Sequence, residues 1–179
     1  MKPSTEELLA VARTYWPSSL EASLHPETCP EYQRLQERWR QELARLDRWH
    51  AFLDVLKNDL PGFIVGDATA TVDACWRCAV YPREGNASLS DWAVVGCVSI
   101  LAPVSTLYAV HQGEIFSPPP SEMRAISDML TRSIESTWKV VALSRDITQT
   151  PVPLWVDPHR PPNTTLFHAL FTSQPESLP

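Results

Sequence analysis

A pair of cysteines is the clearest feature of this chain that could do chemistry by residue type and spacing. Cys75 and Cys78 form a Cys-x-x-Cys motif, which supports thiol–disulfide exchange when it lies in a loop before a helix. Here the surrounding alternation predicts a β-strand, and residues three apart on a strand point to opposite faces. The two sulfurs would diverge, and no second ligand pair stands at zinc spacing. We interpret the motif as two small buried side chains, and we predict neither a metal nor a cofactor.

Carboxylates offer a second kind of chemistry. Asp67 and Asp73 are predicted to share one face of a strand with Thr69 and Thr71. Paired carboxylates there could transfer protons or hold a cation, although a solvated polar face is the simpler interpretation. The five histidines form no His-Glu-x-x-His motif, and no serine stands in a Gly-x-Ser-x-Gly motif. We therefore predict no catalytic residue and expect that the chain is not an enzyme.

The chain contains seven tryptophans, and their positions suggest different roles. Three of them fall on apolar helical stripes and are expected in the core: Trp39, Trp49 and Trp138. Trp76 and Trp92 lie on adjacent predicted strands and are expected to meet across a hairpin. Trp16 and Trp155 lie in connections, where burial is less assured.

Tryptophan and arginine are enriched at binding hot spots. An exposed Trp16, Trp92 or Trp155 would therefore mark a partner surface if an arginine lay beside it. The arginines considered are Arg77, Arg83 and Arg160.

Helices are predicted on both sides of a central β region. Residues 5–15 form a short amphipathic helix that Ser4 or Thr5 can cap. Apolar residues spaced three and four apart predict one long helix over residues 30–57. The same spacing predicts a helix from 123 to 141 in the C-terminal half, and a short helix follows at 164–171.

The central region predicts an antiparallel meander. Residues 63–81, 92–102 and 104–111 are rich in valine, threonine and aromatics, and a polar turn and Pro103 separate them. The fold class is therefore α+β, with an antiparallel sheet of three or more strands packed against the long N-terminal helix and the helix of the C-terminal half.

We expect residues 1–179 to form a single domain. Within it, residues 1–29 are an N-terminal helix and its connection, and residues 172–179 are a frayed tail.

Composition narrows the classes of partner. The net charge is −6, which argues against nucleic acid and against an anionic membrane surface. The N-terminus lacks the apolar region of a signal peptide, and no apolar stretch is long enough to span a bilayer. We expect a cytoplasmic protein whose four cysteines stay reduced.

A small acidic α+β chain with the apolar run WAVVGCVSILAPVSTLYAV, a charged helix before it and the ending TTLFHALF resembles the immunity proteins that protect bacteria from polymorphic toxins. The resemblance implies a tight complex with a toxin domain, which is often basic and would be attracted to an acidic surface. The candidate partner-binding residues are Asp67, Asp73, Glu84, Asp91, Trp92, Trp16 and Trp155.

Three alternatives stay open at the level of sequence. The first is a chaperone or adaptor for a secretion or assembly system, which would hold a client segment on the sheet or on an exposed apolar face of the helix at residues 30–57. The second is an enzyme whose site is assembled from scattered residues. The third is that the partner is a second copy of this chain, so that the protein forms a homodimer.

Overall fold

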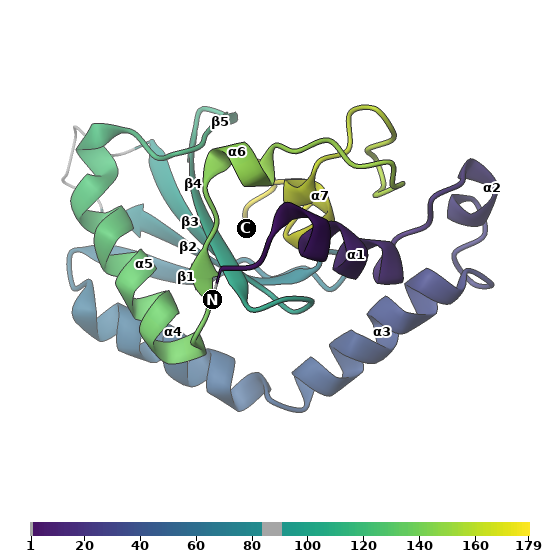
Figure 1. The fold of residues 1–179 in the computed structure, drawn as a ribbon. Coiled ribbons are helices and arrows are strands. Elements are labelled where there is room, and N and C mark those ends of the chain that lie inside the picture. The colour runs from purple at the N-terminus through teal and green to yellow at the C-terminus, as the bar shows by residue number, and fades with distance from the viewer. Residues whose placement is uncertain (1, 84–90) are drawn as a thin grey trace.

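An antiparallel sheet forms the centre of the structure, a computed structural model that describes residues 2–83 and 91–179 (Figure 1). Its strands in chain order are β1 (Phe63–Asp67), β2 (Cys75–Pro82), β3 (Trp92–Ser99), β4 (Val104–His111) and β5 (Glu114–Phe116). Each pairs with the next, and a short β6 (Val141–Ala142) runs parallel to the start of β4. The predicted α+β class and the predicted meander are confirmed.

Helices occupy both sides of the sheet. They are α1 (Thr5–Tyr15), α2 (Leu20–Ser23), α3 (Pro30–Leu43), α4 (Leu46–Asp59), η1 (Ser121–Met123), α5 (Arg124–Trp138), α6 (Arg145–Thr148) and α7 (Leu166–Leu170). α1 begins at Ser4, whose Oγ accepts from the Glu7 backbone while the Glu7 carboxylate accepts from the Ser4 backbone. Within the described residues, no helix has both the length and the apolar character needed to cross a membrane.

The middle strands are buried on both faces, because helices cover each one. On one face, Gly96 lies directly beneath Ile134 and Leu130 of α5. On the other, the Tyr108 ring packs edge-to-face on Phe167 of α7, with ring centroids 5.6 Å apart. α1 in turn contacts α7 and α3. The result is a three-layer arrangement, with α4 and α5 on one side and the two chain ends on the other (Figure 1).

The prediction of one long helix over residues 30–57 is wrong in one respect, because the structure has two helices in this segment. α3 ends at Leu43 and α4 starts at Leu46, with a tight turn in which the Arg45 amide donates to the Glu42 carbonyl at 2.8 Å. The apolar spacing continues through this turn, so periodicity alone gives no sign of it. The turn allows Trp39 and Trp49, one from each helix, to pack on the same ring of Trp76.

The strand predicted over residues 63–81 is also divided. β1 ends at Asp67, whose Oδ1 accepts from the Thr69 backbone at 2.9 Å and so starts a turn. Asp73 is buried and accepts from the backbone amide of Ser173 at 3.0 Å. The predicted polar strand face carrying Asp67 and Asp73 is therefore wrong, because the chain leaves the sheet between them.

The pairing predicted between Trp76 and Trp92 is wrong as well. The β2–β3 register places Trp76 opposite Val98, six residues along β3 from Trp92. The Trp92 ring instead stacks on His111 of β4, with centroids 4.3 Å apart.

The C-terminal tail, expected to fray, lies against the sheet. Arg77 of β2 is buried, and its guanidinium donates to the carbonyls of Gln174 and Ser177 at 3.1 and 2.9 Å and to the Thr172 hydroxyl at 3.2 Å. The Tyr108 hydroxyl donates to the Pro175 carbonyl at 3.0 Å. These bonds satisfy a charge that would otherwise be costly to bury, and they fix the end of the chain.

Gly96 provides a direct test of the packing between β3 and α5. A Cβ at this position would lie 2.8 Å from Ile134 Cδ1 and 3.1 Å from Leu130 Cδ2. We expect Gly96→Ala to lower the free energy of unfolding by about 1–3 kcal/mol through overpacking, measured by urea denaturation. Gly62→Ala is the matched control, because nothing lies within 4 Å of its Cβ position. Equal effects of the two substitutions would contradict this packing.

Candidate functional site

A groove lies beside α2. Figure 1 shows that α2 projects from the body of the molecule at this end. Two hollows of about 530 and 380 Å³ meet here, sharing Ser23, Tyr32 and Asp157 in their linings. We call this surface the α2 groove and define it by Leu20, Leu24, Tyr32, Val72, Trp155 and Arg160.

Apolar side chains are exposed around the α2 groove. Leu20 is 50% exposed, Leu24 is 65% exposed and Val72 is 75% exposed. Other exposed large apolar residues of the described chain lie singly, one on each of α3, α4, β1 and β5: Leu43, Val55, Ile64 and Ile115. Scattered apolar residues are ordinary on a protein surface, whereas a group around one groove marks an interaction site.

The floor of the groove is rigid and aromatic. Tyr32 packs edge-to-face on Trp16, with ring centroids 5.9 Å apart, and the buried Trp16 indole donates to the Ala169 carbonyl at 2.7 Å. Burial raises the pKa of the Tyr32 phenol, and the nearby Cys29 and Asp157 raise it further. The Trp155 amide donates to the Pro17 carbonyl at 2.8 Å, which ties the two walls together.

One wall of the groove is held by a pair of stacked histidines. The rings of His159 and His168 lie 3.7 Å apart at an angle of 9°. His159 Nε2 lies 2.6 Å from the Ser173 carbonyl and carries the hydrogen, since a carbonyl can only accept. His168 Nδ1 accepts from the Thr165 amide at 3.1 Å, which caps α7. The wall is thereby joined to the sheet through α7.

The charged residues that line the α2 groove in the described structure are Asp157 and Arg160, one of each sign. Glu21 and Glu27 are exposed on and after α2, and Asp157 is exposed on the opposite wall. Arg160 lines the groove as a cation on the same wall as Trp155. An apolar centre with a charged rim is the usual anatomy of a protein–protein interface.

The structure places the partner-binding residues predicted from the sequence in different environments. Trp155 is partly exposed and lines the groove together with Arg160, which is the tryptophan–arginine pairing proposed above for a partner surface. Trp16 is buried in the groove's floor, and Asp73 is buried against Ser173. Neither side chain presents an exposed surface to a partner.

The other candidates lie elsewhere. Asp91 directly precedes β3, and the partly exposed Trp92 is the first residue of that strand and packs on His111 and Phe116. Asp67 is exposed at the end of β1, opposite Cys78, and is not brought together with Asp91. Glu84 lies outside the described residues.

Leu20, Leu24, Tyr32 and Val72 are functional candidates that sequence reasoning missed. Leu20 and Leu24 fall in a segment whose polar composition predicts a connection, and α2 is only a four-residue helix. Val72 sits in a turn that was predicted as strand. No local pattern distinguishes these residues, because their grouping depends on how the chain ends fold together.

The Cys-x-x-Cys motif lies on β2, as predicted, with its sulfurs on opposite faces. Cys78 faces Gly96 beneath α5, whereas Cys75 contacts Cys97 on the other face. Burial raises the pKa of Cys78 to about 12 and raises that of Cys75 well above its usual range. Both are therefore neutral thiols at physiological pH, and a thiol is a poor nucleophile.

The described part of the chain holds no group of three His, Cys, Asp or Glu residues that could bind a metal ion. Comparison with protein-family models, with curated proteins and with solved structures finds no match. The function is therefore inferred from the geometry of the surface itself.

The stacked histidines predict a pH dependence of stability. Burial, with a smaller contribution from His159, lowers the pKa of His168 from 6.5 to about 4. The unfolded chain then binds more protons between these values, so stability present above pH 6.5 is lost as the pH falls towards 4. His168→Gln, which keeps a capping side chain at this position, should reduce that loss. Because the ring is partly exposed, the difference should be on the order of 1 kcal/mol.

The measurement is urea unfolding at pH 7 and pH 5 for the unaltered chain and for His168→Gln. His25→Gln is the control, because His25 is exposed and its only charged neighbour is Glu27 among the described residues. If the free energy of unfolding fell between pH 7 and pH 5 as much in His168→Gln as in the unaltered chain, His168 would not be the cause of the pH dependence.

Proposed function

We propose that this chain is a protein-binding inhibitor of the immunity type, which neutralises a cognate bacterial toxin domain by forming a tight complex. The observation that carries the proposal is the α2 groove. Exposed Leu20, Leu24 and Val72 surround an aromatic floor, and Asp157 and Arg160 also line the groove. The net charge of −6 points to a basic partner.

The form of the groove favours a protein partner over a small ligand. Its most exposed apolar side chains lie on the short α2, at the C-cap of α2 and in a turn, so a partner would need an extended surface to cover all three. Complete burial of one such side chain contributes roughly 1.5–3 kcal/mol, and these three are already partly shielded. The expected anchor is an apolar side chain of the partner that lies between Leu24 and Trp155.

The rim adds charge complementarity. Glu21, Glu27 and Asp157 would face lysine or arginine residues around that anchor. Attraction between an acidic inhibitor and a basic toxin domain raises the rate of association. High salt screens this attraction and lowers the rate again. A salt-sensitive association rate is therefore part of the proposal.

The chaperone or adaptor alternative receives less support. It would use the sheet, whose middle strands are covered on both faces, or an exposed apolar face along the helical segment at residues 30–57. Among the described residues of α3 and α4, Leu43 and Val55 are the large apolar side chains that are strongly exposed, and they lie on different helices. No continuous client groove runs along this segment.

The test begins with a tagged chain used as bait in the native host, with mass spectrometry as the readout. We expect a stoichiometric partner that carries a toxin domain, and we expect this chain to rescue cells that express that domain. Leu24→Asp and Trp155→Ala should each weaken the complex by about 30-fold or more, the loss typical of hot-spot residues. Binding is measured by isothermal titration calorimetry.

Val55→Asp is the matched control, since Val55 is 52% exposed and lies on α4 outside the groove. It should leave affinity and rescue unchanged. A partner that binds Leu24→Asp and Trp155→Ala as tightly as the unaltered chain would contradict the assignment of the groove. If light scattering showed a dimer that Leu24→Asp breaks, and no toxin partner were found, the inhibitor proposal would be wrong and the groove would be a surface for self-association.

A further inference from the structure

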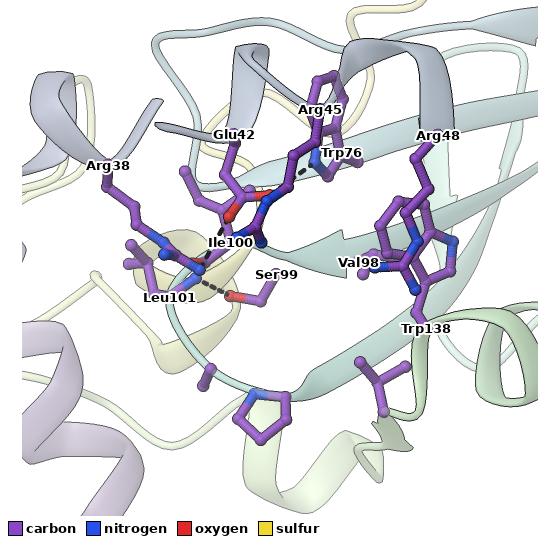
Figure 2. Close-up of a pocket in the computed structure, with 13 residues that line it drawn as sticks. Arg38, Glu42, Arg45, Arg48, Trp76, Val98, Ser99, Ile100, Leu101 and Trp138 are labelled. Atoms are coloured by element: carbon purple, nitrogen blue, oxygen red, sulfur yellow. Dashed lines mark hydrogen bonds and ion pairs between the residues drawn. The ribbon is translucent and has the colours of Figure 1, made fainter. Parts of the chain in front are cut away.

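A second hollow lies at the turn between α3 and α4, and three arginines are among its 13 lining residues (Figure 2). We call it the arginine pocket and define it by Arg38, Arg45, Arg48, Glu42, Trp76 and Trp138. Its volume is about 290 Å³, and the turn between β3 and β4 and the end of α5 close its sides. It shares no lining residue with the α2 groove.

Two of the arginines have partners within the chain. Arg38 donates to the Ile100 carbonyl at 2.6 Å and forms an ion pair with Glu42 at 2.9 Å. Arg48 donates to the Thr137 carbonyl at 2.8 Å, and its guanidinium lies 4.3 Å from the centre of the Trp138 ring. These contacts hold both guanidinium groups in place at the two sides of the pocket.

Glu42 is buried, and its negative charge is neutralised within the pocket. One carboxylate oxygen pairs with Arg38, and the other lies 3.5 Å from the indole nitrogen of Trp76. A buried carboxylate with two such partners is balanced and has little capacity to compensate a further cation.

Neither Arg45 nor Arg48 has an anionic partner among the described residues, and Arg45 is the one whose donors are free. Its side chain is exposed and makes no hydrogen bond or ion pair with any described residue. Figure 2 shows it extending into the pocket between Arg38 and Arg48. With Glu42 cancelling one of the three arginines, the pocket holds an excess of two positive charges in a chain whose net charge is −6.

We propose that the arginine pocket binds a small phosphate monoester that carries one flat ring. A phosphate monoester has a charge close to −2 at neutral pH, which matches the excess of the pocket. The forked N–H groups of a guanidinium fit phosphate oxygens, and Arg45 has all of its donors available. The Arg48 guanidinium lies over the Trp138 ring and would offer its other face to the ligand's ring, and the volume limits the ligand to a phosphate and about one ring.

The test uses isothermal titration calorimetry of the purified chain at low ionic strength, with phenyl phosphate and inorganic phosphate as probes. We expect saturable binding of one phenyl phosphate, with several-fold weaker binding of inorganic phosphate because it lacks the ring. Arg45→Gln should weaken both by about tenfold, since it removes the free charge. Arg45 is exposed, so the variant should fold, as circular dichroism and its melting curve would show.

Arg132→Gln is the matched control, because Arg132 is an exposed arginine of α5 outside the pocket. It should leave the affinity for both probes within a factor of about two. Binding that does not saturate, or an equal loss in the two variants, would overturn the proposal. It would also be overturned if phosphate did not bind while Arg45→Gln weakened a complex with a protein partner, because the pocket would then receive an acidic side chain of that partner.

Discussion

The packing of two tryptophans on Trp76 determines the arrangement of the functional surfaces. Trp39 meets the Trp76 ring edge-on at 5.1 Å, and Trp49 stacks on it at 5.4 Å. These residues belong to α3 and α4, so the contacts fix both helices to the start of β2. Since Trp76 is itself buried in the sheet, the turn between the helices has a defined position rather than a flexible one.

The two surfaces lie at the two ends of α3. Its first turns carry Tyr32 and Leu35 into the α2 groove, and its last turns carry Arg38 and Glu42 into the arginine pocket. The sheet contributes little exposed surface of its own, because layers cover β2, β3 and β4 on both faces. The two proposed binding surfaces are therefore built mainly from helices and connections, which the buried sheet supports.

Local patterns in the sequence predict the elements well and their divisions poorly. The strand at 104–111 and the helix at 5–15 match the structure, because each has strong periodicity and clear end signals. The break near Arg45 has neither glycine nor proline, and the apolar spacing crosses it. Arg77 shows the same limit, because strand alternation places it on a face but cannot reveal that the chain's last residues return to bind it.

The candidate site was predictable only in part. Trp155 and Arg160 are close in sequence, so a tryptophan–arginine surface there could be considered from local composition. Leu20, Leu24 and Val72 gather around them only because Trp16 anchors the N-terminal segment to α7 through the Ala169 carbonyl. Such a surface depends on contacts between residues more than a hundred positions apart, which a single sequence does not reveal.

Hydrogen–deuterium exchange of the chain with and without its captured partner tests the central claim most directly, because it maps the contact surface without altering the protein. The account predicts slower exchange on binding in residues 19–32 and 154–160, with residues 91–98 of β3 unchanged. Protection centred on Asp91 and Trp92, with residues 19–32 unaffected, would contradict it and would place the partner at the opposite end of the sheet.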